Sequence, residues 1–371
     1  MEFDTKLVQA GHDMGDGGDV VQPIHVASTF EQRTQHDLRY FYGRGENATR
    51  EDLEECLAAL EDAAHALTFS SGQAAGATAL SLLSPGQTLV SSDDVYGGTY
   101  ALFSMLPKYG IKVDYQDLSS GEGLDRMLTP DVGLVWLETP TNPLLKVTDI
   151  RAVAERAHAL DIPVVVDNTF ASPVLQQPLE LGADITLYST TKFVSGHSDV
   201  IGGALVYNSD DLHDTFFAYR TAHGNIPGAL DCFLMRRGLK TLSLRVHRQN
   251  DNAQAIVEEL LASPKVGNVR YPGLPGHPQH DVAKRQMSGY GAIITFDYLG
   301  EPAELLQKVE RFAVAVSLGS VHSFIECPAL MTHRPIPADV RRSLGITDNL
   351  IRLAVGIEDP RDLVADLRQA L

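Results

Sequence analysis

Short apolar runs alternate with longer amphipathic stretches through the first two thirds of the chain. Seven runs have the length and β-branched content of buried strands, at residues 66–69, 88–91, 111–115, 133–137, 162–166, 185–188 and 204–206. The stretches between them keep helical spacing, as at 149–160, which ends before Pro163. This alternation predicts crossover units and a mostly parallel seven-stranded sheet covered on both faces.

The pattern changes at both ends of this region. Residues 1–45 contain Gly-Asp-Gly-Gly at 15–18 and little periodicity, so we expect an extended arm. A helix is expected from Thr49, because Thr49 and Asp52 match a capping box and apolar residues follow at helical spacing.

Beyond about residue 236 the chain predicts a different architecture. A long polar-faced helix at about 239–262 precedes a loop rich in proline and glycine at 271–280. Strands expected at 292–296 and 350–355, with helices around them, indicate a smaller α+β domain. The predicted organisation is an arm (1–45), a large domain (46–235) and a C-terminal α+β domain (236–371).

The net charge excludes some classes of binding partner, and the few cysteines indicate the cellular compartment. The formal net charge of −18 opposes binding to nucleic acid and to anionic membranes, so neither is an expected partner. The 3 cysteines lie far apart, which argues against a disulfide framework or a structural zinc site and suits the cytoplasm. We find no signal peptide pattern and no run near the roughly 18 apolar residues of a membrane span.

Lys192 lies just past the apolar run at 185–188, after three hydroxyl residues at 189–191 and ahead of Gly196. This position is the carboxyl edge of the sheet, where open α/β sheets bind ligands. An amine there can form a Schiff base with a carbonyl, the chemistry that pyridoxal phosphate requires. Because most lysines are simply solvated, the interpretation depends on finding the rest of a cofactor site.

Other strand ends carry groups that suit the same cofactor. Asp167 can pair with a protonated pyridine nitrogen or cap a helix. Tyr96 can stack on a ring or pack internally, and Asn142 can donate to a ring oxygen or belong to a proline turn. Gly72 opens a helix whose free amides favour phosphate, although glycine also serves close packing there. Because the ordinary alternatives would have to hold at every position together, the set predicts a pyridoxal-phosphate site.

Ordered motifs along the chain resemble those of the Cys/Met-metabolism family of pyridoxal-phosphate enzymes. This family includes cystathionine γ-synthases, cystathionine γ- and β-lyases and methionine γ-lyases. The matching motifs lie at 42–44, 93–99, 138–143, 166–170, 189–192, 196–199, 237–241 and 350–359. Residues 271–275 and 327–333 look most like cystathionine γ-lyases. The resemblance implies the aspartate-aminotransferase-like fold (fold type I) and γ-elimination of cystathionine, a small sulfur amino acid.

The resemblance also implies a role for each matching position. Lys192 would carry the Schiff base, Asp167 would hold the pyridine nitrogen, and Tyr96 would stack on the ring and protonate the leaving sulfur. Asn142 would lie near the phenolic oxygen of the cofactor. The implied phosphate ligands are Gly72, Gln73, Ser189 and Thr191, with Tyr42 and Arg44 reaching a neighbouring subunit's phosphate in a homotetramer of active dimers. Arg352, aided by Ser323, would clamp the substrate carboxylate, and His322 would face the substrate.

Several positions depart from the family pattern and keep alternatives open. His322 stands where members usually carry glutamate, and Phe41 and Ala101 replace charged groups of the cystathionine γ-lyases. These changes weaken the expected grip on the far end of cystathionine and favour a smaller substrate such as methionine. Gly98 stands where methionine γ-lyases typically have cysteine, and Ala48 replaces a proline. Cystathionine γ-synthase, methionine γ-lyase and a catalytically inactive assembly subunit remain as alternatives.

Overall fold

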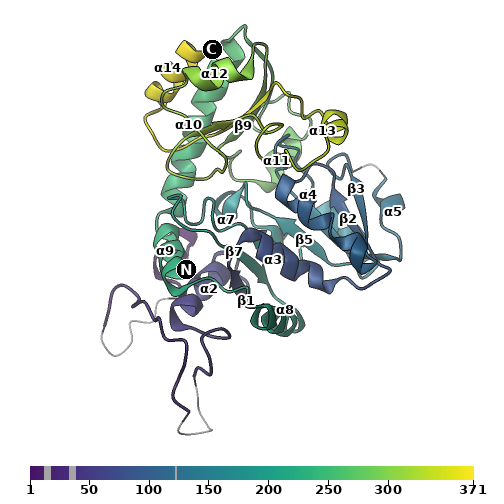
Figure 1. The fold of residues 1–371 in the computed structure, drawn as a ribbon, viewed down its shortest axis with the longest axis vertical. Coiled ribbons are helices and arrows are strands. Elements are labelled where there is room, and N and C mark those ends of the chain that lie inside the picture. Colours follow the sequence, from purple (N-terminus) through teal and green to yellow (C-terminus); the bar gives the residue numbers. More distant parts are fainter. Residues whose placement is uncertain (12–17, 33–38, 122) are drawn as a thin grey trace.

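The computed structural model describes residues 1–11, 18–32, 39–121 and 123–371. Figure 1 shows two lobes, a larger one built around the first sheet and a smaller one that holds the C-terminus. Helix α10 (Leu242–Ala262) runs from the larger lobe into the smaller one. Residues 12–17 and 33–38 of the expected arm, and with them most of its glycine-rich motif, lie outside the described residues.

The larger lobe contains the predicted seven-stranded, mostly parallel sheet. Its strands are β1 (His65–Phe69), β2 (Thr88–Ser92), β3 (Lys112–Gln116), β4 (Val132–Glu138), β5 (Val164–Asp167), β6 (Ile185–Tyr188) and β7 (Gly203–Tyr207). They lie in the order β1-β7-β6-β5-β4-β2-β3, and β7 is antiparallel to both of its neighbours. Each strand expected from an apolar run is present, because a parallel sheet covered on both faces needs apolar side chains on both.

Both faces of this sheet are buried under helices. In β4, Leu134 and Trp136 enter one hydrophobic core, whereas Val135 and Leu137 enter the other. The first core is closed by α3 (Gly72–Ala79), α4 (Gly97–Phe103) and α8 (Asp210–His223), and the second by α5 (Leu124–Met127) and α6 (Ile150–His158). Further helices of the lobe are α2 (Ala48–Leu60), α7 (Ser172–Leu175) and α9 (Ala229–Leu239).

Helix α2 begins earlier than expected, so the prediction that Thr49 caps it is wrong. The cap is Asn47, whose side-chain oxygen accepts from the amides of Thr49 at 3.0 Å and Arg50 at 3.2 Å. The Thr49 hydroxyl instead accepts from the amide of His25 at 2.8 Å and donates to the carbonyl of Pro23 at 3.2 Å. Asparagine is at least as good an N-cap residue as threonine. The Thr49 side chain is therefore free to hydrogen-bond the arm at Pro23 and His25.

The first residues also differ from the expected extended arm, because Phe3–Gln9 form helix α1. Leu7 is buried with side chains of α2, and Arg236 donates to the carbonyl oxygens of Leu7 and Ala10, each at 2.8 Å. Packing and these two hydrogen bonds therefore stabilise a helix too short to persist alone.

The smaller lobe is built on a five-stranded sheet in the order β10-β11-β12-β9-β8. The expected strands correspond to β9 (Ile293–Tyr298) and β12 (Leu350–Ala354). Three strands were not predicted, namely β8 (Val266–Arg270), β10 (Ala313–Val314) and β11 (Phe324–Glu326). The helices of this lobe are α10, α11 (His280–Gln286), α12 (Pro302–Lys308), α13 (Ala338–Leu344) and α14 (Pro360–Ala370).

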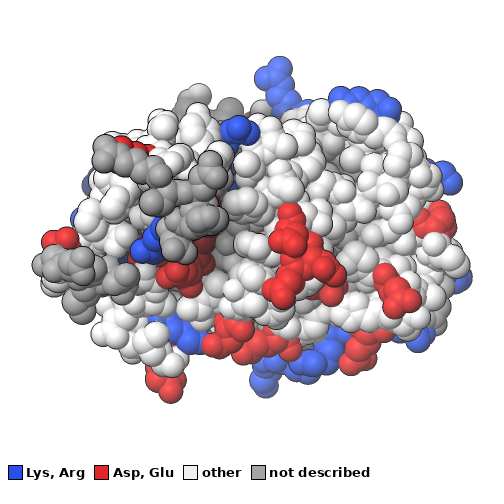
Figure 2. Space-filling model, turned by 90° about the horizontal axis from the view of Figure 1, so that it is seen from below, with Lys and Arg blue, Asp and Glu red and all other residues white. Residues whose placement is uncertain are grey.

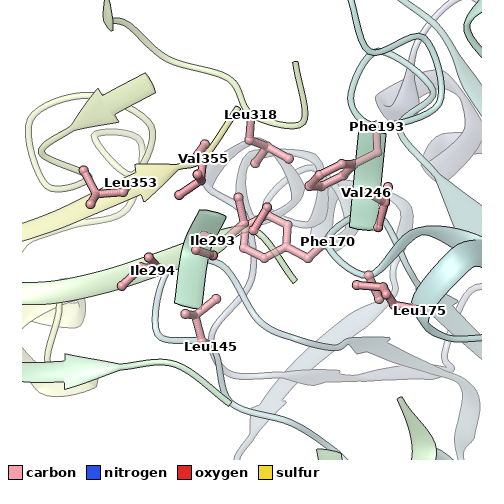
Figure 3. Close-up of a cluster of buried hydrophobic side chains, with 14 of the residues drawn as sticks. Leu145, Phe170, Leu175, Phe193, Val246, Ile293, Ile294, Leu318, Leu353 and Val355 are labelled. Atoms are coloured by element: carbon pink, nitrogen blue, oxygen red, sulfur yellow. The ribbon is translucent and has the colours of Figure 1, made fainter. Parts of the chain in front are cut away.

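One hydrophobic core joins the two lobes. Figure 3 shows Phe170 and Phe193 of the larger lobe among Ile293, Leu318 and Val355 of the smaller one. The loops after β5 and β6 are therefore fixed against the second sheet. The domain boundaries at residues 45 and 235 stay a prediction.

The cysteines and surface charges complete this description. Cys56, Cys232 and Cys327 are free and buried, and burial raises the pKa of Cys56 to about 11 and that of Cys232 to about 12. In the described part of the chain, no helix is long and apolar enough to cross a membrane. Within the same residues, no group of three histidine, cysteine or acidic side chains is placed to hold a metal. On the face drawn in Figure 2, acidic and basic side chains lie next to one another along one edge.

Candidate active site

Two adjoining cavities, of about 120 Å³ and about 220 Å³, open where β4, β5 and β6 end. Tyr96, Asp167, Ser189 and Lys192 line both cavities. The smaller cavity adds residues from the second lobe, including Arg352, and the larger one adds the start of α3. The structure thus brings together residues that lie as far apart in the sequence as Gly72 and Arg352.

The larger cavity has the donors of a phosphate site at one end. Gly72 and Gln73 form the first turn of α3, where backbone amides are free, and the hydroxyl residues Ser189 and Thr191 line the same cavity. A Cβ at Gly72 would lie 2.9 Å from the Cβ of Ser189, so only glycine lets the helix approach this closely. These groups fit the phosphate of pyridoxal phosphate.

Asp167 supplies a carboxylate that lines both cavities. It is the last residue of β5, and its Oδ1 accepts from the amide of Thr169 at 3.0 Å. Burial raises the pKa of Asp167 to about 6, which means that the ionised form lacks sufficient stabilisation from its surroundings. A protonated pyridine nitrogen would provide the missing positive partner.

Glu138 lies opposite Asp167 in the pairing of β4 with β5. Its Oε2 accepts from the amide of Tyr96 and its Oε1 from the amide of Asn142, each at 3.0 Å. Burial and then the charge of Asp167 raise the pKa of Glu138. Glu138 therefore fixes the backbone of two candidate cofactor residues on neighbouring loops.

The Lys192 amine lies on the boundary between the lobes. Its Nζ donates to the hydroxyl of Ser317 at 2.8 Å. Burial, followed by the charge of Arg352, lowers the pKa of Lys192 to about 8, while Glu326 acts in the opposite direction. The amine is consequently far easier to deprotonate than a solvated lysine.

Arg352 in β12 is almost completely buried, and three groups surround its guanidinium. Nη1 donates to Oδ1 of Asn142 at 2.9 Å, and Nη2 donates to the carbonyl of Ser317 at 2.9 Å. Nη2 also lies 2.8 Å from Oε1 of Glu326. The guanidinium is held in place at the wall of the smaller cavity.

Four predicted site residues line neither cavity. The amide and hydroxyl of Ser323 donate to Glu358 at 2.7 Å and 2.9 Å, so this serine is used within the smaller lobe. His322 is exposed. Tyr42 and Arg44 line a separate cavity of about 430 Å³, and Arg44 donates to the carbonyl of Thr221 at 2.5 Å, an intrachain contact that the sequence did not indicate.

Ser317, Glu326 and Glu138 were missed by the sequence analysis as site residues. Glu138 lay within a quoted motif at a strand end, which was a usable signal. Ser317 has a φ of 95°, a conformation rare outside glycine, and nothing in its sequence context announces this. Glu326 reaches the site only through pairing of β11 with β12.

The chain is similar to known proteins along nearly its whole length. The model of the family "Cys/Met metabolism PLP-dependent enzyme" matches residues 4–371. A cystathionine γ-lyase of Dictyostelium discoideum is 46% identical over 374 residues, covering 99% of this chain and 97% of the relative. A cystathionine γ-synthase of Mycobacterium bovis is 45% identical over 375 residues, covering 99% and 96%.

Two crystal structures of the CalE6 protein of Micromonospora echinospora are also similar. One, described as a γ-lyase of cystathionine, is 61% identical with a TM-score of 0.98, covering 100% of this chain and 99% of that one. The other, described as a methionine γ-lyase, is 60% identical with a TM-score of 0.95 and the same coverage. These likenesses confirm the expected fold type.

Proposed function

We propose that this chain, which belongs to the Cys/Met-metabolism family of pyridoxal-phosphate-dependent enzymes, is a cystathionine γ-lyase. It would convert L-cystathionine and water into cysteine, 2-oxobutanoate and ammonia. One observation carries the proposal. Lys192 and Arg352 line the same cavity, and both donate to Ser317, the amine to its hydroxyl and the guanidinium to its carbonyl.

The cofactor would lie across the two cavities. Gly72, Gln73, Ser189 and Thr191 would hold its phosphate, and Asp167 its pyridine nitrogen. When bound, pyridoxal phosphate supplies an electron sink for negative charge at the substrate Cα. Tyr96 would cover the ring and Asn142 would lie beside it.

Three side chains would perform the remaining work. The Lys192 amine, with its lowered pKa, is suited to take the proton from the substrate Cα. Burial raises the pKa of the Tyr96 phenol, which therefore carries a proton that it can donate to the departing γ-sulfur. Arg352 would orient the substrate through its α-carboxylate, since a planar fork of donors matches two oxygens.

Methionine γ-lyase is the second candidate, and a specific observation favours it. Phe170, Val316 and Leu318 line the smaller cavity, so part of the space near Lys192 is apolar. Phe41 and Ala101 carry no charge with which to hold the distal amino-acid end of cystathionine. A cystathionine γ-synthase would use the same cofactor residues, so only its substrates distinguish it from the two lyases.

The deciding experiment offers the purified protein four substrates separately and identifies the products by mass. These are cystathionine, methionine, cysteine, and O-acetylhomoserine together with cysteine. We expect 2-oxobutanoate and cysteine from cystathionine, and no turnover by Lys192→Ala as the matched control. Methanethiol from methionine with cystathionine untouched would replace the first candidate by the second, and His322, Phe41 and Ala101 would be the residues to revert. If the protein forms cystathionine from O-acetylhomoserine and cysteine and turns over none of the other substrates, it is a synthase.

The assembly and location are proposed on the same basis. We propose a cytoplasmic homotetramer made of two active dimers, in which Tyr42 and Arg44 reach the phosphate of the neighbouring subunit. Support comes from their position on an irregular segment, where they line neither of the two candidate active-site cavities of their own chain. Ser323 and His322, which line neither cavity, are proposed to contact substrate on the basis of the family resemblance alone.

A further inference from the structure

Glu326 and Arg352 form a buried ion pair at the wall of the candidate active site, where Arg352 lines the smaller cavity and Glu326 lies behind it. They are direct cross-strand partners in the antiparallel pairing of β11 with β12. Nη2 of Arg352 lies 2.8 Å from Oε1 of Glu326, and the side chains are 2% and 1% exposed. The family-derived role of Arg352 accounts for the arginine, whereas the carboxylate beside it is unexplained.

Glu326 does not use all the hydrogen-bond donors of the Arg352 guanidinium. The hydrogen bonds of Arg352 go to Asn142 and to the carbonyl of Ser317, and its Nε has no acceptor among the described residues. On Glu326, Oε1 accepts from the Thr332 hydroxyl at 2.7 Å, while Oε2 lacks a donor in the same part of the chain. The pair is thus held by charge more than by matched hydrogen bonds, and N–H groups remain for a second carboxylate.

We propose that Glu326 is a positioning residue that shares Arg352 with the substrate carboxylate and sets the affinity for it. Glu326 balances the charge of the guanidinium and keeps it directed at the cavity. When substrate binds, two carboxylates face one guanidinium, and their mutual repulsion weakens binding. This inference rests on the proposed function, because it takes Arg352 as the carboxylate clamp.

The affinity of the loaded enzyme for L-alanine and for L-alaninamide tests this proposal. Both ligands offer an α-amine, which changes the absorbance of the bound cofactor, but only alanine offers a carboxylate. Glu326→Gln keeps the shape and removes the charge, so the dissociation constant for alanine should fall about tenfold, the effect of a one-unit electrostatic shift. The constant for alaninamide should stay within about twofold, since it lacks the carboxylate that Glu326 repels.

The control is Asp297→Asn, which removes a carboxylate from β9 of the same sheet, where Asp297 pairs with Arg270 at 3.0 Å. This variant should leave the ratio of the two affinities unchanged. Turnover gives a second readout, in which Glu326→Gln should lower KM while kcat changes little, because the gain is in substrate binding.

Loss of the buried partner can destabilise the protein, so Glu326→Asp serves as the second variant. This variant keeps the negative charge but moves it away from the guanidinium. The ratio of the dissociation constants for alanine and alaninamide should therefore change in the same direction as in Glu326→Gln, but by less. An unchanged or reversed ratio in either folded variant overturns the proposal, as does an equal change for both ligands. A wild-type protein that binds cofactor but responds to neither ligand would instead overturn the proposed function.

Discussion

At the scale of single residues, Ser317 connects the two cations of the site. Its hydroxyl accepts from Lys192 and its carbonyl from Arg352. The backbone around it has little freedom, because a Cβ at Gly319 would lie 2.6 Å from the amide nitrogen of Phe193. One short loop of the smaller lobe therefore sets the position of both groups that would meet the substrate.

The lowered pKa of Lys192 predicts how cofactor capture depends on pH. Only the neutral amine attacks a carbonyl, and burial holds the pKa near 8 in the cofactor-free protein. The rate of pyridoxal-phosphate binding should therefore rise about tenfold per pH unit below pH 8 and level off above it. Stopped-flow absorbance between pH 6.5 and 9.5 measures this, with Lys192→Ala as the control. A rate that still climbs through pH 9.5 would mean that Lys192 titrates like a solvated lysine.

At the scale of elements, the start of α3 is fixed by its contact with the turn after β6. The first residue of the helix, Gly72, lies against Ser189, and the helix is capped by Ser71, whose hydroxyl accepts from the amide of Ala74 at 3.0 Å. The phosphate donors of two separate elements are thereby held within one cavity.

Gly72→Ala should separate these two elements. The added Cβ overlaps Ser189 and forces a shift, which costs about 1–3 kcal/mol and lowers cofactor affinity on the order of tenfold or more. Absorbance titration with pyridoxal phosphate measures the affinity. Gly276→Ala is the matched control, since nothing lies within 4 Å of a Cβ there. Equal affinities for the two variants would show that α3 does not hold the phosphate.

The elements also show how far sequence reasoning reaches. The seven strands of the large sheet were predictable, because strands buried on both faces are continuous apolar runs. The missed strands lack that signal: β10 has two exposed residues, and β8 contains glycine and asparagine. Lys192 and Asp167 were found because a strand end is a local feature. Glu326 was not, because its place depends on the register of two strands far apart in the sequence.

At the scale of the whole molecule, the two lobes enclose the site and the arm points away from it. Figure 1 shows the described residues between α1 and α2 extending from the larger lobe, opposite the smaller one. Several apolar side chains on this segment are exposed, including Val26 at 84% and Phe41 at 71%. Exposed apolar groups on an extended segment are what the proposed homotetramer requires of a surface between subunits.

Mixing two inactive variants tests whether sites are shared between subunits. If Arg44 serves the neighbouring subunit, Arg44→Ala and Lys192→Ala each lack activity alone, because each removes one half of every site. Random mixing should make about half of the active dimers mixed, and each mixed dimer should contain one site with both Arg44 and Lys192 intact. The mixture should therefore recover about a quarter of wild-type activity. Light scattering should give about four times the chain mass of 40.3 kDa. Full activity of Arg44→Ala by itself, or an active monomer, would contradict the shared site.

The buried cysteines have a consequence for a protein proposed to release thiols. Disulfide exchange requires a thiolate that can be reached, and burial raises the pKa of Cys56, Cys232 and Cys327 above the ordinary value. A disulfide formed by oxidation of released cysteine or methanethiol therefore meets no accessible thiol on the folded chain. The burial of its three thiols therefore disfavours exchange with any disulfide to which the released thiols are oxidised in solution.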